Sequence, residues 1–202
     1  TAVLVETNRV VIDRVDSLGL YAVEIPTNRY ILRESMFIDL AQAPRRPEAT
    51  ASGIYILALK GPASEVWMEA LERLGVRVEF FVPNYAYVSR IPSDSLFAVA
   101  SSPFVMAVLP WIPEYALSHE VKQLAGPTAL RAYPFPDSTA EDVISSLPRD
   151  EVVDVVWDDH GIMYTELVGD RATALLLAES PDIYLVDVAH EAVASVANDQ
   201  AR

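Results

Sequence analysis

The sequence predicts an α+β fold with two consecutive units, each in the order strand, helix, strand, strand, helix, strand, and a β-rich extension at the N-terminus. Helical and strand periodicities alternate in the same order twice along the chain. In both units the second helix stops at a Ser-Pro pair before an apolar strand, so that residues 100–105 match residues 178–183. Six elements in a shared order indicate an internal duplication more strongly than one matching hexapeptide does.

The first unit begins with an apolar strand and a capped helix. Ser64 precedes an amphipathic helix as its N-cap, and Gly75 stands where that helix should end. The predicted strands of this unit cover 54–59, 76–82, 85–91 and 105–111, and a second helix starts at Pro92-Ser93-Asp94.

The second unit repeats these elements. Ser138 or Thr139 caps its first helix and Asp170 caps its second, with Ala174, Leu177 and Ala178 on the inner face of the second helix. Its predicted strands cover 128–134, 152–157, 162–168 and 183–188. Both units therefore follow the βαββαβ pattern of a split, ferredoxin-like arrangement with an antiparallel sheet.

Proline-rich stretches set the predicted domain boundaries. Ala43-Pro44-Arg45-Arg46-Pro47 favours an extended linker, and a less sharp break ends at Gly126-Pro127. In the extension, residues 10–15 and 20–25 predict a strand pair, and residues 21–26 resemble residues 87–92. The pair is a relic of a third unit or a hairpin that joins a neighbouring sheet, or the likeness is a coincidence between amphipathic strands. The predicted parts are 1–49 for the hairpin extension and Pro-rich linker, 50–115 for the first unit, 116–127 for a linker, 128–188 for the second unit and 189–202 for a C-terminal tail.

Composition excludes several classes of function. The 29 acidic and 15 basic residues give a net charge of −14, which argues against nucleic acid and anionic membranes as partners. The chain has no cysteine, so disulfides, thiol catalysis and thiolate metal sites are excluded. No apolar run approaches the roughly 20 residues of a membrane span.

The residue types that could catalyse a reaction or bind a metal do not occur at the spacings typical of such sites. His119, His160 and His190 lie far apart, and the acidic turn at 158–160 is typical of an exposed hairpin. No serine stands on a glycine-flanked strand-to-helix turn, and no glycine-rich phosphate loop occurs. We therefore expect no catalytic residues, no cofactor and no metal in this chain. Four aromatic residues are expected to pack in the core and on a sheet face: Trp67, Phe80, Phe81 and Tyr85.

Several segments resemble the inhibitor-like pro-region of subtilisin-type serine proteases. In the first unit they are 55–59 (Tyr-Ile-Leu-Ala-Leu) with Gly61-Pro62, then 67–72, Leu74-Gly75, 81–88, 102–105 and 110–113. In the second unit they are Ser180-Pro181, Ile183, Val186-Asp187 and the ending 198–202. The resemblance covers residues 53–202 and differs from the simple family pattern in having two units.

The resemblance implies a pro-region that assists folding of a secreted subtilisin-like protease and then inhibits it. In that family the open sheet face packs on the protease and the C-terminal tail lies in the active-site cleft. We expect the second unit to dock, because it precedes the place where a catalytic domain would begin. We also expect Asp187 and Glu191 to accept hydrogen bonds from helix N-termini of the partner. The protease-binding residues are then Asp187, Ala189, His190, Glu191, Ala192, Val193, Ala194 and Ser195.

Two other interpretations remain open at this stage. The chain could be a stand-alone inhibitor that acts on a protease in trans. It could also be a tandem ferredoxin-like regulatory module that senses a small ligand, although Gly61-Pro62 is only a weak version of the glycine-rich loop that this would favour. The alanine-rich tail suits an extended strand in a cleft, but the same alanines also favour a short helix.

Overall fold

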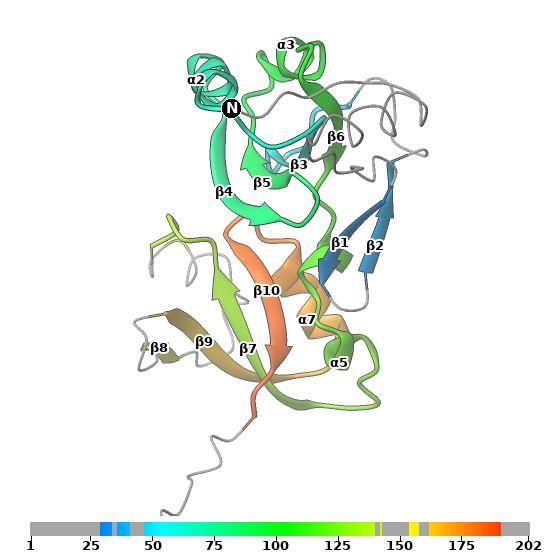
Figure 1. Ribbon diagram of the computed structural model, residues 1–202. Coiled ribbons are helices and arrows are strands. Elements are labelled where there is room, and N and C mark those ends of the chain that lie inside the picture. The colour runs from blue at the N-terminus through cyan, green and yellow to red at the C-terminus, as the bar shows by residue number, and fades with distance from the viewer. Residues whose placement is uncertain are drawn as a thin grey trace, which may run out of the picture. The chain divides into compact units, whose positions relative to one another are not determined.

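The computed structural model describes residues 29–33, 36–40, 47–139, 142, 154–157 and 162–190. The chain divides into two compact units, Thr1–Trp111 and Ile112–Arg202 (Figure 1). Each unit contains its own four-stranded antiparallel sheet with helices, which confirms the predicted α+β class. None of the helices in the described residues is long and apolar enough to cross a membrane.

The sheet of the first unit has the strand order β4-β5-β3-β6, and all of its neighbouring strands are antiparallel. Numbered within the unit, this order is second, third, first, fourth. The bounds agree with the predicted strands to within one residue at most ends: β3 (Ile54–Leu59), β4 (Arg77–Val82), β5 (Ala86–Arg90) and β6 (Val105–Pro110).

Two helices pack on one face of this sheet (Figure 1): α2 (Glu65–Arg73) and α3 (Leu96–Ala100). Ser64 caps α2 as predicted, because its hydroxyl accepts a hydrogen bond from the Trp67 amide at 3.3 Å. Gly75 follows α2 with a φ of +74°, the left-handed conformation that ends helices and favours glycine. The core between helices and sheet is formed by Tyr55, Leu57, Leu59, Leu71, Val76, Ile91, Leu96, Val99, Val105 and Val108.

An antiparallel hairpin that the sequence analysis did not anticipate precedes the first sheet. It consists of β1 (Arg29–Arg33) and β2 (Met36–Asp39), and β1 lies against β4. Ile38 is buried in this part of the chain. The predicted strand pair at 10–15 and 20–25 lies outside the described residues.

The sheet of the second unit has the order β10-β7-β9-β8. Numbered within the unit, this is fourth, first, third, second, which is the order of the first sheet read from its other edge. All neighbouring strands are again antiparallel. The two units thus share one strand order, as the duplicated sequence pattern predicts. The strands are β7 (Thr128–Pro134), β8 (Asp154–Trp157), β9 (Met163–Gly169) and β10 (Ile183–Val188).

Helix α7 (Arg171–Ala178) packs against β10 and β9. The Asp170 carboxylate caps it by accepting hydrogen bonds from the amides of Ala172 and Thr173 at 2.9 and 3.0 Å. The predicted inner face is confirmed, since Ala174, Leu177 and Ala178 are all buried.

The first helix predicted for the second unit is described only at its start. Thr139 and Asp142 exchange hydrogen bonds as in a capping box, with the Asp142 carboxylate accepting from the Thr139 amide at 2.8 Å. The predicted inner residues of this helix at 143, 144 and 147 lie outside the described residues.

The stretch expected to be a linker at 116–127 is instead packed into the second unit through residue 122. It contains the last residue of α4 (Pro113–Ala116) and all of α5 (His119–Lys122), and both short helices contact β10. Leu117 bridges to Val186, and the Ser118 amide donates to the Val186 carbonyl at 3.0 Å. Apolar side chains explain the difference, because Ala116, Leu117 and Val121 are buried. The unit boundary accordingly falls between residues 111 and 112 rather than after 115.

Candidate interaction surface

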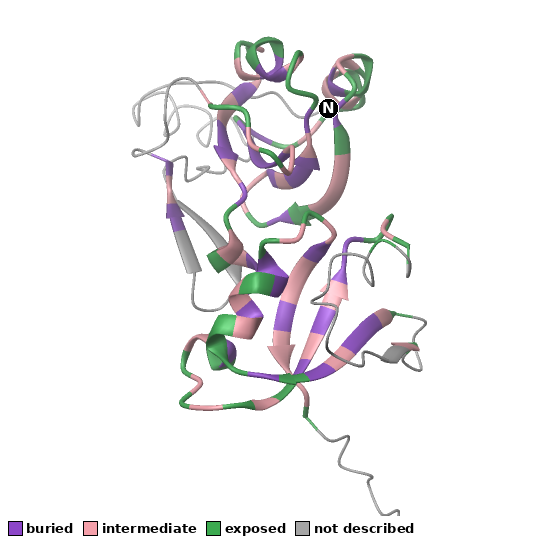
Figure 2. Cartoon of the chain, turned by 180° about the vertical axis from the view of Figure 1, so that it is seen from behind, coloured by how far each residue is buried: buried purple, intermediate pink, exposed green. Residues whose placement is uncertain are grey.

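The strands of the second unit sort their side chains onto a closed and an open face. On β7, Leu130 and Ala132 are fully buried, whereas the alternate residues are partly or fully exposed. Their partners on β9, Leu167 and Thr165, are buried as well. Because α7 packs against one side of the sheet, the alternating burial identifies the opposite side as the open face (Figure 2).

A row of charged side chains crosses this open face. Arg131 on β7 lies opposite Glu166 on β9 and opposite Asp187 on β10. Its Nε donates to Glu166 Oε1 at 2.7 Å, with the two side chains 27% and 40% exposed. This hydrogen bond raises the pKa of the Arg131 guanidinium above its usual value, so that the arginine is a fixed cation. The Asp187 carboxylate accepts a hydrogen bond from the Val188 amide at 2.9 Å.

A row of aromatic and aliphatic side chains runs beside the charged row. Tyr133 lies opposite Leu185, and its ring centroid is 5.7 Å from that of Tyr164. Tyr164 lies opposite Val156 at the edge of the sheet. The Arg131 guanidinium carbon stands 4.7 Å from the Tyr164 ring centroid, a cation–π distance that joins the two rows.

The open face ends where the C-terminal tail begins. Ala129 and Val168 form a third pair of neighbours on this face, and Val168 is 68% exposed. Beyond the end of β10, the Ala189 amide still donates to the Ala129 carbonyl at 2.8 Å. His190 Nε2 follows at 2.9 Å from Glu120 Oε2 on α5. The start of the tail is therefore anchored to the same sheet.

This surface has the composition of a protein interface. Tyrosine and arginine gather in its middle, and these two residue types are enriched among the side chains that supply most of the binding energy in protein–protein contacts. In the part of the chain that the structure describes, no serine or threonine bonds to a histidine, since His119 contacts Gln123 and His190 contacts Glu120. Among the described residues no three histidine, aspartate or glutamate side chains come together as a metal site, and the turn at 158–160 lies outside them.

The sequence analysis identified only those residues of this surface that lie on the last strand or follow it. Asp187 lies on the open face, and Ala189 and His190 lie at its end. Glu191, Ala192, Val193, Ala194 and Ser195 lie outside the described residues. It missed four residues in the middle of the face: Arg131, Tyr133, Tyr164 and Glu166. On β7 the alternation Leu-Arg-Ala-Tyr was the signal that could have found the first two, whereas β9 (Met-Tyr-Thr-Glu-Leu-Val-Gly) carries no such alternation.

The predicted aromatic group of the first unit divides into separate pairs. Trp67 stacks on Phe104 with centroids 5.2 Å apart and packs, like Tyr85, against the core. Phe81 meets Tyr87 edge to face at 5.5 Å. Phe80 instead meets Trp111 edge to face at 6.2 Å, on the other side of the sheet.

In the first unit, the sheet face opposite α2 and α3 is closed. The central strand β3 is buried along its whole length, on both faces. The carboxylate of Glu79, only 3% exposed, accepts from Arg90 Nε at 2.9 Å beside this face. The side chains that form the closed face are Ile54, Ile56, Ala58, Ala86, Val88 and Leu109, none more than 9% exposed.

Part of the chain matches a known protein family. A family described as a domain of unknown function (DUF8729) matches residues 15–125, which is more than half of the chain. The matched range ends before the sheet of the second unit begins. No similar curated protein and no similar solved structure was found.

Proposed function

The chain belongs to the DUF8729 family, and we propose that it is the pro-region of a secreted subtilisin-like serine protease. In this function it assists folding of the catalytic domain and then blocks its cleft, in cis or in trans. The observation that carries the proposal is the open face of the second sheet, which is lined by Tyr133, Arg131 and Val168 and adjoins the start of the tail. In this proposal the catalytic groups belong to the protease domain rather than to this chain.

A ferredoxin-like fold of both units is part of this proposal. In each unit the strand order places the first and third strands at the centre and the fourth and second at the edges. A helix links the third and fourth strands of both units. This order and the capping pair at Thr139 support a βαββαβ unit with one helix layer and one open sheet face.

The open face would supply most of the contact area with the protease, and the tail would block its active-site cleft. Tyr133 and Leu185 offer an apolar patch, while the Arg131–Glu166 pair and Asp187 fix the orientation of the partner by charge. Ala189 and His190 follow the last strand beside this face. An extended tail can then add to the strands that line a protease cleft through main-chain hydrogen bonds.

A matched pair of surface substitutions tests the proposal. Val168→Asp places a charge on the open face, and Leu176→Asp places the same charge on the exposed side of α7, at residues 68% and 58% exposed. Inhibition of a subtilisin-type catalytic domain is measured from the hydrolysis of a chromogenic peptide. We expect Val168→Asp to weaken inhibition at least about tenfold and Leu176→Asp to leave it unchanged, because a charge introduced into an interface is buried without a partner.

The tail is tested by removing residues 191–202, which leaves the Ala189 hydrogen bond to the sheet in place. We expect the truncated chain to fold, by circular dichroism, and to inhibit at least about tenfold more weakly. Failure of the intact chain to inhibit or to assist refolding of any such catalytic domain would overturn the proposal. Equal inhibition by the truncated and intact chains would assign the inhibition to the sheet face alone.

A further inference from the structure

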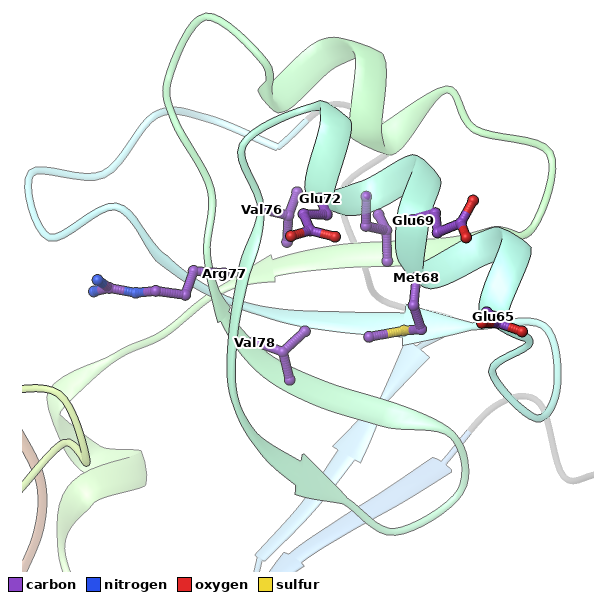
Figure 3. Close-up of a pocket in the computed structure, with 8 residues that line it drawn as sticks. Glu65, Met68, Glu69, Glu72, Val76, Arg77 and Val78 are labelled. Carbon is purple, nitrogen blue, oxygen red and sulfur yellow. The ribbon is translucent and has the colours of Figure 1, made fainter.

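A groove in the first unit lies between the side of α2 and strand β4 (Figure 3). Its volume is about 370 Å³, enough for one or two side chains of another segment. Met68 reaches from α2 toward Val78 on β4, and these two half-buried side chains form an apolar floor with the buried Leu71 and Val76. The groove is separate from the open face of the second unit.

Glutamates form the rim of the groove on the helix side. Glu65, Glu69 and Glu72 follow one another at positions i, i+4 and i+7, so they form one stripe along α2. Arg73 binds Glu69 at 3.3 Å, on the exposed side of the helix. Among the described residues Glu65 and Glu72 make no ion pair.

The nearest cation on the opposite rim is already engaged elsewhere. Arg77 begins β4, and its Nε donates to Glu79 Oε1 at 3.3 Å. Its side chain extends away from the groove in Figure 3. The groove therefore combines an apolar floor with a rim that has an excess of negative charge. The chain as a whole has too few basic residues to neutralise its 29 acidic ones.

We propose that this groove binds a segment of a partner protein in which an apolar side chain is flanked by lysine or arginine. The apolar side chain fills the space over Met68 and Val78, while the flanking cations pair with Glu65 and Glu72. Charge complementarity selects this occupant, because an acidic segment would bring like charges together and a purely apolar segment would leave the glutamates partly desolvated.

Binding of short labelled peptides to the full chain tests this inference by fluorescence anisotropy. The probe has a central leucine with arginines on both sides, and the comparison peptides replace the leucine by alanine or the arginines by glutamates. We expect the leucine–arginine peptide to bind most tightly and its affinity to fall as salt is raised from about 0.05 to 0.5 M.

The double variant Glu65→Gln/Glu72→Gln should weaken binding of this peptide about threefold to thirtyfold. The control is Glu114→Gln/Glu179→Gln, which changes the same net charge at exposed glutamates of the second unit. Equal losses in both double variants would reduce the binding to general attraction and overturn the proposal. Met68→Lys, which fills the groove with a cation, should abolish binding while circular dichroism stays unchanged.

Two further outcomes would also overturn it. One is equal binding of the leucine and alanine peptides, because the apolar floor would then have no role. The other is self-association of the chain that the Glu65→Gln/Glu72→Gln variant abolishes, which would identify a second copy as the occupant. The protease assay with Val168→Asp uses a different unit, so failure here leaves the proposed function standing.

Discussion

The two sheets share one strand order but differ in the face that lies opposite their helices. In the first unit this face is apolar and closed, and Val88 on its third strand is fully buried. In the second unit the same face is open, and Val168 on the third strand is 68% exposed. The same topology therefore gives a closed sheet in one half and a sheet with one open face in the other.

The sequence of the first strand in each unit explains why one sheet face is closed and the other is open. Strand β3 reads Ile-Tyr-Ile-Leu-Ala-Leu, a continuous apolar run of the kind that is buried on both faces. Strand β7 reads Thr-Ala-Leu-Arg-Ala-Tyr-Pro, in which Arg131 and Tyr133 alternate with buried residues. A continuous apolar run predicts a covered sheet, and an alternating one predicts a sheet with one free face.

The largest expected effect comes from a charge placed on each face. Val88→Asp should unfold the first unit, because an unpaired carboxylate cannot be buried there, whereas Val168→Asp should change stability by less than about 0.5 kcal/mol. Urea denaturation followed by circular dichroism checks both. The milder pair Val88→Ala and Val168→Ala should differ by about 2 kcal/mol in the free energy of unfolding. Similar losses from the two alanine variants would show that the faces do not differ as described.

A second comparison uses the arginine–glutamate pairs of the two sheets, of which Glu79 forms two, with Arg90 and Arg77. Glu79 is 3% exposed and holds Arg90 at 2.9 Å, whereas Glu166 is 40% exposed and holds Arg131 at 2.7 Å. Glu79→Gln removes one charge of a buried pair and should cost about 1.5–3 kcal/mol. Glu166→Gln should cost about 0–1 kcal/mol, since water replaces the lost interaction. The two free energies of unfolding come from urea titrations, and a larger cost for Glu166→Gln would contradict the comparison.

Local signals in the sequence were sufficient for most of the two units. Ser64 and Asp170 cap helices in the structure as predicted, and Gly75 ends a helix with a positive φ. Strands β3, β7 and β10 have the predicted bounds. These features depend on neighbours in the chain, which is why residue patterns alone can identify them.

Features that depend on distant contacts were not predicted. The hairpin of β1 and β2 lacks a strong turn signal, and the packing of 116–122 against β10 depends on Val186, far along the chain. The charged row of the candidate surface is formed by Arg131, Glu166 and Asp187 from three strands, and it exists only once the register is set. The sequence placed Asp187 correctly on a strand end but could not say what lies beside it.

Acid should distinguish the helix caps of the two units. The cap of α2 is the Ser64 hydroxyl, which does not titrate, whereas the cap of α7 is the Asp170 carboxylate. Hydrogen bonds, first from the Thr173 amide, hold the pKa of Asp170 below its usual value. Its contribution to stability is therefore complete above the unfolded pKa of about 3.9 and is lost as pH falls through the folded pKa.

Asp170→Asn keeps a capping side chain but removes this titration. The variant should lose less stability than the wild type between about pH 5 and pH 2, whereas Ser64→Ala should lower stability by a similar amount at every pH in that range. Thermal unfolding across this pH range, followed by circular dichroism, checks both. Parallel pH profiles for wild type and Asp170→Asn would show that the cap does not contribute through its charge.

The smallest expected effect concerns two exposed side-chain contacts, the Glu69–Arg73 ion pair in the first unit and the Glu120–His190 contact in the second. All four side chains are more than half exposed, so Glu69→Gln and Glu120→Gln should each change the free energy of unfolding by less than about 0.5 kcal/mol.

Their local effects should differ, because Glu69 binds a residue of its own helix whereas Glu120 binds the beginning of the tail. Hydrogen exchange at the Ala189 amide should become faster in Glu120→Gln, since this amide bonds to Ala129 at the edge that His190 helps to hold. Glu69→Gln should leave that exchange rate unchanged. Unchanged exchange at Ala189 in both variants would show that its hydrogen bond to the sheet alone fixes the start of the tail.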